Sequence, residues 1–417
     1  MPIGFAKSVF SQSATAAGGS TTAWRSWDGS NDVTTNIDTL APGASSAIDN
    51  WLGFCEFSDT HGLAFGIKDF THSNDKIVYR VIKNTSDSLS SPGGGDFVSG
   101  SNNENRDFNG ALIPTAAGNI FSLSNHTAGR VGAIYSLSGD TATRHTEFNI
   151  QSAGGEGFAH GIVRVAGSDV YITRNNQNQF QKITLTDNGN SSSISAATEV
   201  TFSGTYYYTK NGPRGFVNAN TMLLMASDTY DNVSTNGDAI IPLTFDLTDT
   251  GTGNTPDRVF SDATKQDLDM NSSNNFMQMS MNHSMPHFTT DFSDKTYHFE
   301  RLGSGASNQI RTHVFKSGES DIQTSNTITL STGTDSDTSF SCIHVGDTDD
   351  VLLMAFIQVG ADSLKILKYI YSTNTLSEVV SIANGSDWTH ERLKLARWGN
   401  DRAIMLYDDG KMRLLKP

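Results

Sequence analysis

One local pattern recurs along the whole chain: an alternating apolar segment, a tight turn rich in Asp, Asn and Gly, and a second, more continuously apolar segment. In the first instance Phe57-Ser58-Asp59 precedes Leu63-Ala64-Phe65. The turns can be aligned on one polar residue each, at Asp59, Asn119, Asp169, Asn220, Asp294, Asp350 and Asp401. Their spacings are 60, 50, 51, 74, 56 and 51 residues, close to the length of a four-stranded unit. Such a repeat restricts the chain to a repeated β architecture.

Two further strands follow each of these turns in the predicted unit. The third strand is apolar, as in Ile77-Val78-Tyr79, and the fourth is usually more polar, as in Glu147-Phe148-Asn149-Ile150. Inner strands are covered on both faces and are therefore apolar, whereas an outer edge strand is polar. The 38 glycines, the abundant Ser, Thr, Asn and Asp and the few runs of helix-forming residues together favour β structure with many turns, and no segment is typical of an amphipathic helix. We therefore expect an all-β fold, a seven-bladed β-propeller with four-stranded antiparallel blades.

The two ends of the chain predict how this ring closes. The last repeat stops at Pro417, directly after its third strand, which would leave an open edge. Residues Ile3–Phe10 form a spare strand-like segment, so we expect residues 1–12 to be the closing strand of the last blade, an arrangement common among propellers. The single domain 1–417 then has a surface linker at 13–47 and blades at 48–417. An insertion near 261–284 is expected to protrude or to line the channel.

Charge, hydropathy and cysteine content argue against several kinds of partner and of stabilising cross-link. The formal net charge of -15 argues against binding to nucleic acid or to an anionic membrane, which require clustered Lys and Arg. No run of 18 apolar residues and no obvious export signal is present, so membrane insertion is not expected. Cys55 and Cys342 indicate two isolated buried thiols rather than a disulfide framework.

Candidate binding residues are placed by the expected channel mouth, where variable loops extend from rigid blades. Residues just before the innermost strands could form a ring of imidazoles and guanidiniums for an anionic group, a sugar or a metal; these are His160, Arg214, His287, His390 and Arg392. Loops between second and third strands supply amides, imidazoles and a phenol for a carbohydrate or protein surface; these are His72, Asn74, His126, Asn175, Asn176 and Tyr230. The alternative is that the first set caps strand ends and the second forms solvated turns.

Motifs for catalysis and cofactors are not found. Methionines between Met270 and Met285, with His283 and His287, could hold a soft metal, but their alternation is equally typical of a packed strand face. The Ser-x-Asp-x-Gly-x-Thr-Trp boxes of sialidase-like propellers are missing, and Trp27-Asp28 stands alone where WD repeats would recur. No nucleophile elbow, zinc motif or phosphate loop is present. We therefore expect no enzyme activity, no cofactor and no bound metal.

Three functions from different classes remain open. The opening Met1–Ser8 and the Asn-, Ser- and Gly-rich composition resemble those of phage virion proteins. That resemblance implies a non-enzymatic structural or adhesive component of a phage or virus particle, tail-associated and in several copies. Its partners would be other virion proteins and a host-surface glycan or receptor, and it would be made in the host cytoplasm and act outside. The alternatives are a secreted carbohydrate-binding or carbohydrate-active propeller, and an intracellular protein-interaction scaffold.

Overall fold

The computed structural model shows a chain that is mostly β structure, in antiparallel sheets of which most have four strands. Every element in the described part of the chain is a β-strand. The structure describes residues 33–36, 48–68, 76–86, 88–96, 111–126, 129–152, 162–164, 170–176, 179–187, 193–201, 207–208, 216–218, 221–227, 239–246, 257–258, 268–269, 289–292, 295–302, 309–316, 323–329, 340–344, 351–358, 363–383, 394–399, 402–407 and 411–415.

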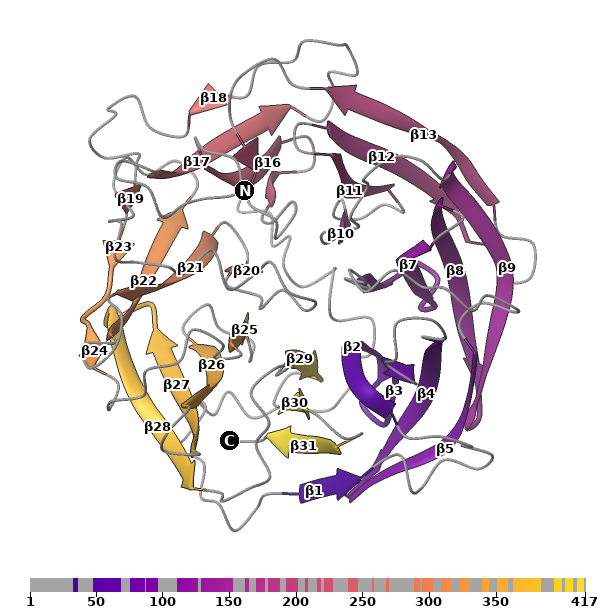
Figure 1. Cartoon of the computed structure of the whole chain (residues 1–417), viewed down its shortest axis with the longest axis horizontal. Coiled ribbons are helices and arrows are strands. Elements are labelled where there is room, and N and C mark those ends of the chain that lie inside the picture. The colour runs from indigo at the N-terminus through magenta and orange to yellow at the C-terminus, as the bar shows by residue number, and fades with distance from the viewer. Residues whose placement is uncertain are drawn as a thin grey trace, which may run out of the picture.

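The described strands form seven sheets, which follow one another in chain order around a common centre (Figure 1). Sheet 1 comprises β2 (Ile48–Ser58), β3 (His61–Lys68), β4 (Lys76–Thr85) and β5 (Ser88–Asp96). Sheet 2 comprises β6 (Ala111–Pro114), β7 (Ile120–His126), β8 (Gly129–Ser138) and β9 (Thr141–Ser152). Sheet 3 comprises β10 (Ile162–Arg164), β11 (Val170–Asn176), β12 (Gln179–Thr186) and β13 (Ser193–Thr201).

The next two sheets have divided strands. Sheet 4 comprises β14 (Tyr207–Tyr208), β15 (Phe216–Asn218), β16 (Thr221–Ser227), β17 (Ala239–Asp246), β18 (Asp257–Arg258) and β19 (Leu268–Asp269). Sheet 5 comprises β20 (Thr289–Phe292), β21 (Lys295–Leu302), β22 (Gln309–Lys316), β23 (Gln323–Thr324) and β24 (Ile328–Thr329). Within the expected insertion, β19 pairs with the start of β17, so this short piece extends the edge of sheet 4. The rest of 261–284 lies outside the described residues.

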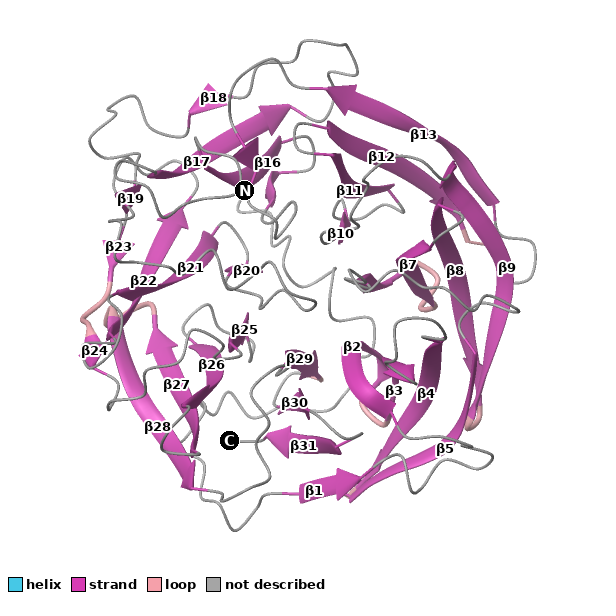
Figure 2. Ribbon diagram, in the orientation of Figure 1, coloured by secondary structure: helices cyan, strands magenta, loops and turns pink. Residues whose placement is uncertain are grey.

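The last two sheets complete the series. Sheet 6 comprises β25 (Phe340–His344), β26 (Val351–Gln358), β27 (Ser363–Ile370) and β28 (Thr375–Ala383). Sheet 7 comprises β29 (Lys394–Trp398), β30 (Arg402–Tyr407), β31 (Lys411–Leu415) and β1 (Val33–Asn36). Figure 2 shows the strands of the sheets passing from the centre, near β29, to the rim, near β28 and β9.

The second strand of sheet 1 shows why such strands are apolar throughout. Leu63, Ala64 and Phe65 are all fully buried in β3. Ala64 belongs to the apolar cluster that sheet 1 shares with sheet 7, whereas Leu63 and Phe65 belong to the cluster shared with sheet 2. Because successive side chains of a strand point to opposite faces, a strand between two neighbouring sheets needs apolar residues at every position. The predicted layering of apolar inner strands is confirmed here.

The pairing at the outer edge of β31 differs from the expectation. β1 pairs antiparallel with β31, from Val33 opposite Leu414 to Asn36 opposite Lys411. The expected linker 13–47 thus contains the strand that occupies this edge, in place of residues 1–12, which themselves lie outside the described residues. The physical reason is that this position is an outer edge of the sheet, which is exposed to solvent. A short, polar strand with β-branched residues suits such an edge better than an apolar strand does.

Candidate functional site

Most of the predicted binding residues lie outside the described part of the chain: His160, Arg214, His287, His390, Arg392, His72, Asn74 and Tyr230. The methionine and histidine segment 270–285 lies outside it as well. His126 ends β7 and pairs with Gly129, and Asn175 and Asn176 end β11, where Asn176 pairs with Gln179. These three backbones therefore lie at the connections between second and third strands, as predicted.

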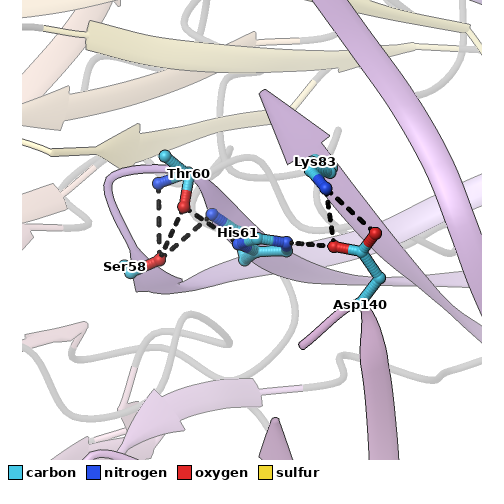
Figure 3. A network of polar contacts seen from close by, with 5 residues as sticks. All are labelled: Ser58, Thr60, His61, Lys83 and Asp140. Carbon is cyan, nitrogen blue, oxygen red and sulfur yellow. Dashed lines mark hydrogen bonds and ion pairs between the residues drawn. The ribbon is translucent and has the colours of Figure 1, made fainter. Parts of the chain in front are cut away.

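Other polar residues do come together in the structure, and one such group lies between sheets 1 and 2 (Figure 3). In the turn between β2 and β3, the Ser58 hydroxyl accepts hydrogen bonds from the backbone N–H groups of Thr60 and His61, at 3.3 and 3.2 Å. The Thr60 hydroxyl lies 2.9 Å from Nδ1 of His61. On the other side of the ring, Nε2 of His61 lies 2.8 Å from Oδ1 of Asp140. The carboxylate of Asp140 comes from the turn between β8 and β9 in sheet 2.

Lys83 completes this network from β4. Its Nζ donates to both carboxylate oxygens of Asp140, at 2.8 and 2.9 Å. Lys83 is directly opposite His61 in the pairing of β3 with β4, which is why both side chains reach the same carboxylate. The hydrogen bonds from Lys83 and then from His61 lower the pKa of Asp140 below its ordinary value of 3.8. Asp140 is therefore a stable anion at neutral pH.

The order Thr60, His61, Asp140 has the hydrogen-bond connectivity of a nucleophile, a base and an orienting acid. Lys83, however, holds both oxygens of the carboxylate. The His61 side chain is 14% exposed and lies between two sheets, whereas the Asp140 side chain is 45% exposed at the outside. The His61 imidazole thus connects a turn of sheet 1 to a turn of sheet 2, through a carboxylate 79 residues away in the sequence. The arrangement is suited to linking sheet 1 to sheet 2.

A second polar link joins sheet 2 to sheet 3. Asp187 directly follows β12, and its carboxylate accepts a hydrogen bond from the Thr115 hydroxyl at 2.5 Å. The amide of Asn119 donates to both oxygens of Asp187, at 3.1 and 2.9 Å. Asn119 is one of the turn residues on which the repeats align, so this recurring turn position contributes to a contact between sheets.

A third polar link joins sheet 5 to sheet 6. Asn326 forms two hydrogen bonds with the backbone of Leu376 in β28, at 3.0 and 2.7 Å, as a neighbouring strand would. Gln323 donates to the Tyr369 hydroxyl at 3.1 Å, and that hydroxyl donates to Asn374 at 3.0 Å. Burial raises the pKa of Tyr369 to about 12, so the phenol stays a hydrogen-bond donor. Asn374 adopts a positive φ of 50°, which asparagine tolerates in turns.

A fourth link joins the last sheet to the first. The indole Nε1 of Trp398 donates to the Ser58 carbonyl at 3.1 Å, and the backbone N–H of Gly399 donates to Oε2 of Glu56. Nη2 of Arg402 donates to the Asp59 carbonyl at 3.4 Å. The Phe54 and Trp398 rings pack against each other across the same two sheets, with their centroids 4.9 Å apart. Sheets 7 and 1 thus share both polar contacts and an apolar cluster.

The first, second and fourth links lie at the same end of the sheets, because they use the connections between first and second strands and between third and fourth strands, which antiparallel pairing places at one end. In the third link Asn374 lies in such a turn, whereas Asn326 lies between β23 and β24, the two pieces of a fourth strand. Sequence reasoning did not single out Asp140, Asp187 or Glu56 for these contacts. Asp140 and Asp187 lie in the turn-like sequences Gly139-Asp140 and Asp187-Asn188-Gly189, where solvation is the usual explanation of a carboxylate.

Three further observations concern metal binding, membrane spanning and thiol reactivity. The described residues contain no group of three or more His, Cys, Asp or Glu side chains arranged to hold a metal ion. No helix in the described part of the chain is long and apolar enough to cross a membrane. Cys55 is a free, buried thiol, and burial raises its pKa above the ordinary value, which keeps it protonated and unreactive.

Comparison with known proteins gives structural neighbours but no family. No protein-family model matches the chain, and no curated protein matches it in sequence. Sqt1 from Chaetomium thermophilum is similar with a TM-score of 0.48 at 10% identity, over 92% of this chain and 100% of that one. The RRP9 WD40 repeats give a TM-score of 0.48 at 6% identity, over 90% and 98% of the two chains. An oligogalacturonate lyase from Vibrio parahaemolyticus gives 0.41 at 10% identity, over 84% and 78%.

Proposed function

We propose that the seven described sheets are the seven blades of a closed β-propeller, with β1 as the fourth strand of the last blade. Two contacts support closure: the pairing of β1 with β31, and the joint between sheets 7 and 1 around Trp398 and Glu56. Residues at opposite ends of the chain meet at both. A cryo-EM or crystal structure tests this directly, since a six- or eight-bladed ring, or a gap between sheets 7 and 1, would contradict it.

We infer that the protein is a non-enzymatic binding scaffold. The observation that carries this inference is that the two ends of the sheets differ in their polar links and in the length of their connections. At one end, polar side chains of the described turns are used to bond neighbouring sheets together, as at Asp140 and Asp187. Most of the longer connections leave from the opposite end: 97–110, 153–161, 330–339 and 384–393 each join a fourth strand to the next first strand, whereas 247–256, between β17 and β18, leaves from the linked end. A rigid scaffold with most of its long connections at one end is the usual basis of recognition.

The setting that we propose is a phage or virus particle, in which the protein serves assembly or attachment to a host-surface glycan or protein. Composition supports it: 29 Lys and Arg against 44 Asp and Glu give an acidic chain, and such a surface keeps a protein soluble through self-repulsion. Mass spectrometry of purified particles from a source that carries the gene is the test. Its detection in stoichiometric copies with other structural proteins is expected, and its absence from particles would refute this setting.

Binding itself is tested separately with the purified protein. A glycan array and capture on host cells should show attachment without any change in the bound molecule. Release of reducing sugar from a bound polysaccharide would instead identify a carbohydrate-active enzyme and contradict the non-enzymatic proposal. Specific capture of cytosolic proteins, with no binding to glycans or cells, would favour an intracellular scaffold.

A further inference from the structure

Glu56 is an acidic residue inside an apolar strand, in the sequence Phe54-Cys55-Glu56-Phe57 of β2. Side chains two positions apart in a strand lie on the same face. Phe54 packs on Trp398 of sheet 7, and Glu56 accordingly reaches the same sheet, at Gly399. A carboxylate therefore lies in the joint between the first and last sheets, next to an apolar cluster.

The backbone at Gly399 presents its N–H to this carboxylate. Gly399 has a φ of 67°, a left-handed conformation that glycine adopts without strain. Its N–H donates to Oε2 of Glu56, and its carbonyl accepts a hydrogen bond from Nε of Arg397 at 2.7 Å. The neighbouring Trp398 is fully buried and donates to the Ser58 carbonyl. Glu56 is thus hydrogen-bonded to the residue that directly follows Trp398, whose indole also binds sheet 1.

The charged groups that face Glu56 come from both sheets. Arg397 and Arg402 of sheet 7 favour its ionised form, and Asp59 of its own sheet opposes it. Burial has the largest effect, so that the pKa of Glu56 is raised above its ordinary value of 4.5 in spite of the Gly399 N–H and the two arginines. Placing a charged carboxylate in this joint costs more than placing a neutral one.

We propose that Glu56 is a protonation-dependent latch that holds sheet 7 to sheet 1 more firmly in mildly acidic solution than at neutral pH. The sign follows from linkage: a carboxyl group with a raised pKa in the closed joint binds its proton more tightly there than when exposed. Its stabilising effect is fully present below about pH 4.5 and is lost as pH rises through the raised value. This inference does not depend on the protein's partner or setting.

The test is amide hydrogen exchange at Gly399 between pH 4.5 and 8, expressed as protection relative to the intrinsic exchange rate at each pH. In the natural protein we expect protection to fall by up to about tenfold per pH unit and then to level off. Glu56→Gln, which mimics the neutral side chain, should remove this dependence. Glu378→Gln, at an exposed position of β28, is the matched control and should keep the natural profile.

Two results would overturn the latch. One is an equal pH dependence of Gly399 protection in the natural protein and in Glu56→Gln. The other is a ¹³C titration of the Glu56 carboxyl carbon that gives a midpoint at or below 4.5, and this measurement decides the matter on the natural protein even where the variant fails to fold. A midpoint above 4.5 together with a flat Glu56→Gln profile supports the proposal.

Discussion

At the residue scale, the described side chains that could take part in acid–base chemistry instead join neighbouring sheets. His61 could accept a proton from Thr60, but its other nitrogen is directed at Asp140, which Lys83 also holds. The imidazole can serve this role when neutral, since the Thr60 hydroxyl then donates to Nδ1 while Nε2–H donates to Asp140. The network is therefore a contact between sheets 1 and 2.

Acid should break this contact through Asp140. The pKa of Asp140 is lowered in the folded protein, so its contribution to stability is present above about pH 3.8 and is lost as pH falls through the folded value. Asp140→Asn should therefore flatten the loss of stability between pH 4 and pH 2. Urea unfolding at a series of pH values is the measurement, and an unchanged acid slope in the variant would contradict the prediction. The stabilising effect of Glu56 is lost only as pH rises above about 4.5, so the two pH windows do not overlap.

Glycines in β5 provide a second test at this scale. A Cβ on Gly94 would lie 2.5 Å from the Tyr79 carbonyl oxygen, which is backbone and cannot turn away. Gly94→Ala should lower the free energy of unfolding by about 1–3 kcal/mol, the usual effect of overpacking. Gly93→Ala is the matched control, because its Cβ would meet only the Asp140 carbonyl oxygen at 3.5 Å. Equal stability of the two variants in urea unfolding would show that the close approach is not as described.

At the element scale, turns act as joints between sheets. The turn between β6 and β7 supplies Thr115 and Asn119, and both bind Asp187 at the end of β12. Asn326 similarly satisfies the backbone of β28, whose outer side would otherwise present free hydrogen-bonding groups. Neighbouring sheets are thus held by specific polar contacts at their turns as well as by apolar packing.

A double-mutant cycle measures the strength of one such joint. Asn119→Ala, Asp187→Ala and the double variant should give a coupling energy of about 0.5–3 kcal/mol, because the two side chains share two hydrogen bonds. The free energies of unfolding of the three variants and the natural protein provide it. Thr329→Ala with Asn119→Ala is the control pair, since Thr329 is an exposed residue of β24 in sheet 5. A coupling as small as that of the control pair would mean that the contact contributes nothing.

At the scale of the whole molecule, β1 joins the beginning of the chain to its last sheet. Consecutive residues of a strand direct their N–H groups to opposite sides, so either Thr34 or Thr35 donates toward β31. The double variant Thr34→Pro/Thr35→Pro must remove that donor. We expect a clear fall in the melting temperature, larger than that caused by deletion of residues 1–12. A larger effect of the deletion would restore residues 1–12 as the closing strand.

The sequence alone predicted the strands and their order. Alternating apolar residues and Asp, Asn or Gly turns reflect interactions between near neighbours, so the turn at Asp59 and the apolar run Leu63–Phe65 could be located without a structure. Four-stranded antiparallel sheets followed from the repeat. The predicted ligand-binding residues remain predictions, since those with described backbones, such as His126 and Asn176, are located only at strand ends.

Tertiary structure alone decided which polar residues meet. His61 and Asp140 are 79 residues apart, and Glu56 and Gly399 are 343 apart, so nothing in the local sequence of either partner marks the other. The edge strand was missed for a related reason: Val33–Asn36 is short and polar, and its suitability depends on the exposed edge of β31 that it covers. Local patterns are determined by neighbours in the chain, whereas links between sheets depend on how the sheets are placed around their common centre.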